Sequence, residues 1–240
     1  MMLNYETYWN DNQSHPYHPS VRMRNKFILD TLCSLSPKSI LDCWCGDWYL
    51  VSVLKDKYWT ADVTMHGIDY SKAVTDINKV KRPDIDFSYW DLWLPLLSAR
   101  TYDVVICSEV IEHIVDRHQV VWNLSKLISS WWYIILSTQS GKRYESDLVN
   151  GHVKHFSLQE LEDDFAQYNV QTIFSYKKWF PWYDLQKMVH SNLIWTAKSI
   201  QYGEMTVWKK ALFTFVYRLF LFTPKSKTLW TQIYMLLQKK

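Results

Sequence analysis

Residues 38–58 read KSILDCWCGDWYLVSVLKDKY, and this stretch decides the fold class. The run Ser39–Cys43 is largely apolar and short, which predicts a buried strand. Apolar residues then recur at helical spacing, at Leu50, Val53 and Leu54, and predict a helix over Tyr49–Tyr58. Only a tight turn separates the two elements. A strand that passes directly into a helix is the building unit of α/β folds.

The same alternation continues on both sides of this unit. Strands alternating with helices predict a mostly parallel sheet with helices on both faces, a Rossmann-like, doubly wound α/β fold. Parallel strands buried on both faces are continuously apolar, and DVVIC and YIILST fit that pattern. The further strands are expected at Val63–Asp69, Ile85–Tyr89, Asp103–Cys107 and Tyr133–Thr138, and the further helices at Ser20–Leu35, Lys72–Val80 and Asp116–Ser129.

Beyond Thr138 the pattern is less regular. Ser157 and Glu160 form a capping box that predicts a helix to about Gln167, followed by a strand at Val170–Ser175. A final strand is expected at Gln232–Gln238. The roughly 55 residues between these strands are too many for a simple connection, and we expect a helical, aromatic insert there.

Composition bounds the function classes. The 240 residues are 48% hydrophobic and 21% charged, which fits one globular domain and excludes a disordered chain. No apolar run approaches the ~18 residues of a spanning helix, and the N-terminus lacks a secretory pattern. Four cysteines do not make a disulfide framework. We therefore expect a reduced, cytoplasmic protein.

Polar motifs follow the predicted strands. The first is Asp42-Cys-Trp-Cys-Gly-Asp-Trp-Tyr49. With glycine at 44 and 48 it resembles the glycine-rich turn of class I S-adenosylmethionine (SAM)-dependent methyltransferases, where glycine lets the backbone approach the ligand. The other motifs, HGIDYS (66–71), FSYWDL (87–92), YDVVICSEVIEH (102–113) and LISSWWYIILST (127–138), resemble the same family in the same order. The resemblance covers about Ser20–Val170 and is greatest to small-molecule O-methyltransferases of ubiquinone biosynthesis.

This resemblance implies a seven-stranded sheet with an antiparallel last strand, and SAM as cofactor. By the family's pattern, Asp69 accepts the ribose hydroxyls, Asp91 meets the adenine amino group, and the 43–48 turn holds the methionine end. The expected cofactor-binding residues are Asp42, Cys43, Trp44, Gly46, Trp48, Asp69, Tyr70, Ser71, Asp91, Leu92 and Ser108.

The acceptor side is expected around two histidines. The segment GHVKHFS (151–157) resembles the family segment that lines the acceptor pocket. Histidine can remove a hydroxyl proton near neutral pH, so His113 and His155 are the candidate catalytic residues. Glu109, Glu112 and His113, with His152 or His155, also resemble the magnesium site of small-RNA 2′-O-methyltransferases. We expect a pocket without metal.

Tryptophan stands where the resembled family has glycine. The chain has 14 Trp and only 5 Gly, whereas ordinary usage predicts about 17 glycines. Trp44, Trp48, Trp90, Trp131 and Trp132 occupy family glycine positions. Our hypothesis is that UGA codons, which some bacterial lineages read as glycine, were translated as tryptophan. Two alternatives stay open: a catalytically dead binding module, if Trp44 and Trp48 are native, and an NAD(P)-binding Rossmann enzyme.

The chain divides into an N-terminal segment with the first helix (1–35), a SAM-binding core (36–175), a helical lid or acceptor insert (176–230) and a final strand (231–240). Residues 205–240 carry seven Lys or Arg and no acid, against 20 basic and 24 acidic residues before them. Trp208–Phe222 is apolar with cationic flanks and indicates either peripheral membrane contact or a lid or dimer interface. The expected partner is a small-molecule, lipid or glycan acceptor. The weak overall charge disfavours nucleic acid, and oligomeric state is not determined.

Overall fold

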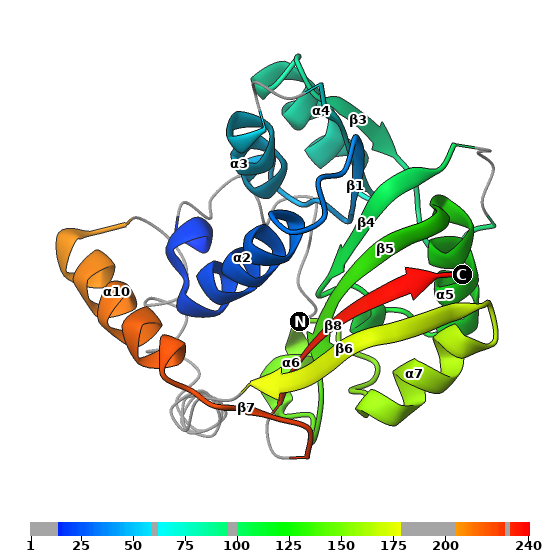
Figure 1. Cartoon of the computed structure of the whole chain (residues 1–240). Helices are drawn as coiled ribbons and strands as arrows, with labels where there is room; N and C mark the ends of the chain where they lie inside the picture. Colours follow the sequence, from blue (N-terminus) through cyan, green and yellow to red (C-terminus); the bar gives the residue numbers. More distant parts are fainter. Residues whose placement is uncertain (1–13, 59–61, 96–99, 179–204, 229–230) are drawn as a thin grey trace.

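A computed structural model describes residues 14–58, 62–95, 100–178, 205–228 and 231–240 of the chain. One sheet runs through it in the strand order β3-β2-β1-β4-β5-β8-β6-β7 (Figure 1). The strands are β1 (Ser39–Cys43), β2 (Thr64–Asp69), β3 (Asp86–Tyr89), β4 (Tyr102–Ser108), β5 (Ile128–Gln139), β6 (Val170–Lys178), β7 (Lys225–Ser226) and β8 (Gln232–Lys239).

The pairing confirms the predicted α/β class. Strands β3, β2, β1, β4 and β5 pair in parallel, and β8 runs antiparallel between β5 and β6. The predicted number of strands is wrong, since the described residues form a sheet of eight strands rather than seven. The extra strand is the two-residue β7, which pairs with the end of β6 at Lys177 and Lys178. Backbone groups of β7 thereby pair with those at the end of β6, which would otherwise form an open edge of the sheet.

Capping residues set the starts of three helices, α4 (Lys72–Lys81), α5 (Arg117–Leu127) and α7 (Leu158–Ala166). Ser71, Asp116 and Ser157 each cap a helix, their side chains accepting from the N–H groups of Val74, Gln119 and Glu160 at 3.2 Å each. The other described helices are η1 (His15–Tyr17), α2 (Pro19–Leu32), α3 (Tyr49–Lys57), η2 (Ile111–His113), α6 (Glu145–Val149) and α10 (Val207–Leu221).

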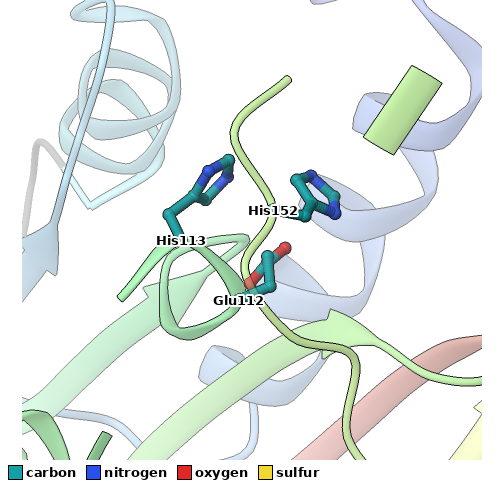
Figure 2. A group of neighbouring side chains, drawn as sticks. All are labelled: Glu112, His113 and His152. Carbon is teal, nitrogen blue, oxygen red and sulfur yellow. The ribbon is translucent and has the colours of Figure 1, made fainter. Parts of the chain in front are cut away.

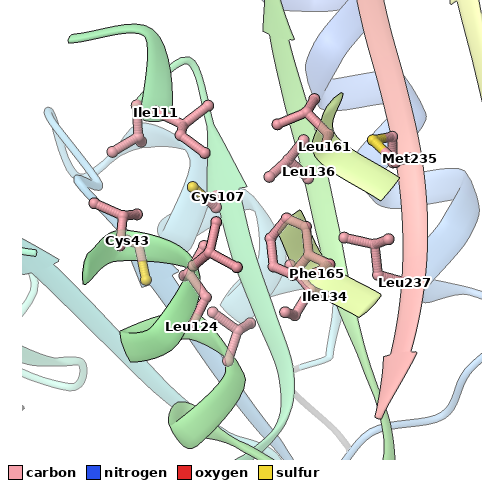
Figure 3. Packing of buried hydrophobic residues seen from close by; sticks show 14 of the residues in the cluster. Cys43, Cys107, Ile111, Leu124, Ile134, Leu136, Leu161, Phe165, Met235 and Leu237 are labelled. Atoms are coloured by element: carbon pink, nitrogen blue, oxygen red, sulfur yellow. The ribbon is translucent and has the colours of Figure 1, made fainter. Parts of the chain in front are cut away.

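Both faces of the sheet are buried, as a doubly wound fold requires. Alternate residues of β4 point to opposite sides, so that Val105 and Cys107 join one core cluster and Val104 and Ile106 the other. The first cluster is completed by residues of α5 and α7, including Leu124 and Phe165 (Figure 3). The second is completed by apolar residues of α2 and α3. These layers fix the ends of β1 and β4, where the candidate site lies.

The predicted insert is described in part. Residues 179–204 and 229–230 lie outside the described residues, and the division of the chain into segments stays a prediction. Strand β6 extends to Lys178, into the range predicted as insert. Helix α10 packs on α2, with Phe220 buried against Met23 and Phe213 buried beside His18, so α2 lies between α10 and the sheet (Figure 1).

The described residues also bear on compartment. None of the helices among them is both long and apolar enough to cross a bilayer. All four cysteines fall in the described ranges and are free thiols, with Cys43, Cys45 and Cys107 buried. Free thiols agree with the predicted absence of a disulfide framework, and the cytoplasmic location stays a prediction.

Candidate active site

The site forms where the strand order reverses. Strands β1 and β4 are neighbours, and the chain continues from them toward opposite edges of the sheet. Open α/β sheets bind ligands in the crevice outside the carboxyl ends of such strands. The turn after β1 crosses this crevice. Its backbone is tied to β2, because the Cys45 N–H donates to the carbonyl of Ile68 at 2.9 Å.

Asp69, at the end of β2, holds that turn in place. Its Oδ2 accepts from the N–H of Gly46 at 2.9 Å and its Oδ1 from the N–H of Ser71 at 2.8 Å. The left-handed φ of Gly46, 53°, presents that N–H to the carboxylate. A carboxylate offers about four lone-pair sites, which suits it to accept hydrogen bonds from ribose hydroxyls.

Asp42, at the end of β1, is buried beside two other acids. Burial, with the nearby charges of Asp69 and Asp47, raises the pKa of Asp42 to about 8. Burial likewise raises the pKa of Asp47 to about 6. At neutral pH the Asp42 carboxyl is therefore protonated and can donate a hydrogen bond.

The raised pKa of Asp42 predicts how stability depends on pH. The folded state keeps a proton that the unfolded state loses, so its stabilising effect, complete below pH 3.8, disappears as pH rises to about 8. Asp42→Asn mimics the protonated group. The free energy of unfolding of Asp42→Asn, minus that of the parent, should therefore rise by roughly 1.4 kcal/mol for each pH unit within that window. Urea unfolding at pH 5 and pH 7 measures this gain, and an equal difference at both values would mean that Asp42 has an ordinary pKa.

Several other predicted cofactor-binding residues have side chains that are buried or already hydrogen-bonded. The side chains of Cys43 and Leu92 are buried in the first core cluster, which leaves their backbone groups for ligand contact. Ser71 is committed to the cap of α4, whereas the Oγ atoms of Ser108 and Ser137 are 2.8 Å apart at the ends of β4 and β5. Asp91 follows β3 and accepts from the N–H of Trp93 at 3.4 Å; burial raises the pKa of Asp91.

Trp44 stands in the crevice itself. Its ring centroid lies 4.7 Å from that of Tyr70, which follows β2, and 5.9 Å from that of His113, which follows β4. Its backbone has a left-handed φ of 55°. The indole Nε1 is buried and makes no hydrogen bond. The side chain therefore occupies the place where the fold is expected to bind its ligand.

Trp48 lies elsewhere. Its φ of −59° is helical and it sits at the N-cap position of α3. Its ring packs against the second core cluster, and the Lys81 ammonium lies 5.8 Å from the ring centroid. Trp44 and Trp48 thus make different contacts, although both stand at glycine positions of the resembled family.

A histidine cluster adjoins Trp44. Helix η2 supplies Glu112 and His113, and the loop after α6 brings His152 to face them (Figure 2). The His113 and His152 ring centroids are 4.7 Å apart. His155 lies behind His152, its Nε2 3.0 Å from His152 Nδ1 and 3.8 Å from Asp147 Oδ2. His155 was predicted to be catalytic, whereas His152 and Asp147 were not. The HVKH spacing (152–155) was the available signal for His152.

His113 and His152 are both neutral at physiological pH. Burial lowers the pKa of His113 to about 4 and that of His152 to about 3. Burial also raises the pKa of Glu112 well above its usual range, with the charge of Glu109 adding to the effect. Glu112 Oε2 accepts from Thr138 Oγ1 at 2.7 Å, and Oε1 is buried without a hydrogen bond. The cluster therefore offers neutral imidazole nitrogens as proton acceptors.

The same groups could hold a cation. Potential ligand atoms of Glu112, His113 and His152 all lie within 4.8 Å of one another, as do those of Asp147, His152 and His155. Imidazole and carboxylate ligands suit several divalent metals. Glu109 is engaged elsewhere: it accepts from Gln232 Nε2 at 2.7 Å, and Arg24 lies 3.8 Å from it. A site without metal stays our prediction.

Known proteins share this architecture. Residues 22–173 match the family model described as a methyltransferase domain. The chain is 26% identical over 170 residues to the ubiquinone biosynthesis O-methyltransferase of Coxiella burnetii, covering 68% of this chain and 70% of the relative. It belongs to the class I SAM-dependent methyltransferases. The homologous enzyme of Paraburkholderia phymatum is 28% identical over 170 residues, covering 67% of this chain and 71% of that protein.

Solved methyltransferases have the same fold at lower identity. The N-methyltransferase NodS of Bradyrhizobium japonicum superposes with a TM-score of 0.61 at 10% identity, covering 98% of this chain and 96% of NodS. An O-methyltransferase of a Brevibacillus brevis polyketide synthase gives a TM-score of 0.61 at 15% identity, covering 92% and 74%. The predicted family is thus confirmed. The comparisons favour assigning this chain to the methyltransferases over assigning it to the NAD(P)-binding Rossmann enzymes.

Proposed function

We propose that this methyltransferase transfers the methyl group of SAM to a hydroxyl of a small-molecule, lipid or glycan acceptor. The carrying observation is the cluster of neutral histidines next to the turn after β1, which supplies a proton acceptor beside the cofactor crevice. The names of the related ubiquinone-biosynthesis enzymes, all O-methyltransferases, support oxygen as the attacked atom.

SAM is the cofactor, and the ends of β1, β2 and β3 bind it. Asp69 accepts the ribose hydroxyls, Asp91 contacts the adenine amino group, and the turn after β1 receives the methionine end. Such an enzyme works mainly by positioning, holding the acceptor oxygen ~3–3.5 Å from the methyl carbon and in line with the sulfur. The hydrogen-bonding groups of these strand ends suit this ligand, since the carboxyl groups of Asp69 and Asp91 lie at the end of β2 and after β3, on the proposed adenosine side.

His113 is the base. When bound, SAM would supply the methyl group to the acceptor oxygen, its sulfur keeping the electron pair of the broken carbon–sulfur bond. The hydroxyl proton of the acceptor would pass to the His113 imidazole. His113 also hydrogen-bonds the Gly151 backbone, which fixes its ring. His155 is a positioning residue, since Asp147 and His155 stand behind His152 and orient it toward His113.

Loss of the base should lower turnover but not cofactor binding. In the Trp44→Gly chain, His113→Asn should reduce kcat at least 100-fold with a hydroxyl acceptor that the Trp44→Gly chain methylates, because general-base catalysis typically contributes 10²–10⁴-fold. The control is His118→Asn, a histidine on α5 whose side chain is 55% exposed. Because the pKa of His113 is about 4, the parent's rate should persist below pH 6. A kcat within threefold of the parent in His113→Asn would contradict this role.

Helix α10 is our proposed membrane contact. One face packs on α2: the Arg22 guanidinium lies 3.9 Å from the Tyr217 ring centroid, and Phe213 is buried. The opposite face leaves large apolar side chains exposed. They are Val207, Trp208, Leu212, Phe215, Leu221 and Phe222. Exposed cations accompany them at Lys210, Arg218, Lys225 and Lys227. An exposed apolar stripe with cations suits the surface of an anionic bilayer.

Vesicle binding tests this contact. The protein should sediment with vesicles containing phosphatidylserine, and added salt should weaken that binding. Replacing Lys210, Arg218, Lys225 and Lys227 by Gln should release it, since each cation near the surface adds about 1 kcal/mol. Lys209 is buried and is left unchanged. A matched control replaces Lys55, Lys57, Lys72 and Lys79 on α3 and α4. Absence of binding, or equal loss in the control, would favour a lid or dimer interface instead.

A further inference from the structure

We propose that residues 44 and 131 are glycine in the native protein, their UGA codons being read as glycine rather than tryptophan. For residue 44 this rests in part on the proposed SAM site, whereas residue 131 is argued from the backbone alone. Backbone conformation, exposure and contacts separate these two positions from other tryptophans in the described part of the chain.

The backbone at both positions has the conformation that favours glycine. The φ of Trp44 is 55° and that of Trp131 is 70°. Glycines 46, 141 and 151 of this chain share the region, with φ of 53°, 84° and 84°. A bulky residue there is an outlier, because its Cβ crowds the neighbouring carbonyl oxygen. Both positions are also glycine in the family motifs, so local geometry and motif agree independently.

Trp131 gains little from its side chain. It is 70% exposed, so its indole has few packing contacts to offset the strained backbone. It stands in β5 where the pairing with β4 shifts register, between the Tyr102–Ile128 and Val104–Tyr133 pairs. Irregularities of this type commonly place a glycine in the left-handed region. Nothing in the surroundings of residue 131 selects for tryptophan.

Trp44 obstructs the site of its own family. Its indole lies between Tyr70 and His113, and its Nε1 is buried without a hydrogen bond. Burying an unpaired donor is unfavourable, and here the ring also fills the crevice where the methyl donor must meet the acceptor. Glycine at this position would relieve the backbone and open that space without moving either strand.

The backbone criterion does not extend to every tryptophan. Trp48 has a helical φ of −59°, and Trp122 is half-buried within α5. The proposal is therefore limited to positions 44 and 131. It accounts for part of the imbalance between 5 Gly and 14 Trp in the chain.

The coding DNA and peptide mass spectrometry test this proposal directly. UGA is expected at codons 44 and 131, with glycine at both positions in tryptic peptides of the protein purified from its source cells. UGG at these codons, or tryptophan in those peptides, would overturn it. Glycine in the peptides together with no SAM binding would uphold this inference and instead reject the proposed function.

Recombinant variants give a second test. Trp131→Gly should raise the melting temperature by about 2–4 °C, as expected for relief of strain in a chain of this size. Trp122→Gly is the matched control and should lower it, because glycine is unfavourable inside a helix and packing is lost. A Trp131→Gly chain that melts no higher than the parent would contradict the argument from backbone strain.

Discussion

Replacing Trp44 by glycine should increase SAM affinity by about 10- to 100-fold, to a micromolar dissociation constant. The indole occupies the space between Tyr70 and His113, so the parent must expel it before the methionine end can enter. Overfilling a packed site costs about 1–3 kcal/mol, and displacement by the ligand of a ring packed on both sides costs at least as much. Isothermal titration calorimetry on the parent and the variant measures the difference.

The control for this prediction is Trp48→Gly. Trp48 is also a family glycine position, but its ring packs against the second core cluster and beside Lys81. Its replacement should leave SAM affinity within about threefold of the parent's. Equal affinity of the parent and Trp44→Gly chains would show that the indole moves aside without cost. That result would remove the argument that Trp44 blocks the site.

Asp69→Asn in the Trp44→Gly background should weaken SAM binding at least tenfold. A carboxylate that accepts hydroxyl hydrogen bonds contributes about 1.5–3 kcal/mol, which corresponds to tenfold or more in affinity. Asp69 also holds the Gly46 and Ser71 N–H groups, so a loss of affinity alone could reflect a loosened turn.

A ligand without ribose hydroxyls separates these two roles. In the Trp44→Gly chain, which keeps Asp69, the 2′,3′-dideoxy analogue of S-adenosylhomocysteine should bind much more weakly than S-adenosylhomocysteine does. In Asp69→Asn the two ligands should bind nearly alike. If the variant lowers both affinities by the same factor, Asp69 supports the turn and does not contact the ribose.

Local patterns predicted most of the sheet. Strand Ser39–Cys43 and the caps at Asp116 and Ser157 are confirmed, because apolar runs and capping residues act over a few positions. The predicted start of β5 at Tyr133 was late, since the structure extends the strand back to Ile128. Two hydrophilic serines and the glycine-like Trp131 masked that extension in the sequence. The short β7 was missed because two residues carry no periodicity.

The site was less predictable because it depends on distant contacts. Motif order predicted that Asp69 and the turn after β1 share one site, and the structure joins these two groups through the Gly46 N–H. The position of His152 in front of His155 depends on how the loop after α6 folds over η2, which no local pattern encodes. Likewise, only the packing of α10 on α2 distinguishes the buried Phe213 from the exposed Phe215.

The most direct test is a crystal structure of the Trp44→Gly chain with S-adenosylhomocysteine. The ligand should lie across the carboxyl ends of β1 and β2, with its ribose hydroxyls on Asp69 and its sulfur in the space between Tyr70 and His113. A ligand bound elsewhere, or a crevice still closed in the glycine chain at saturating ligand, would contradict the account.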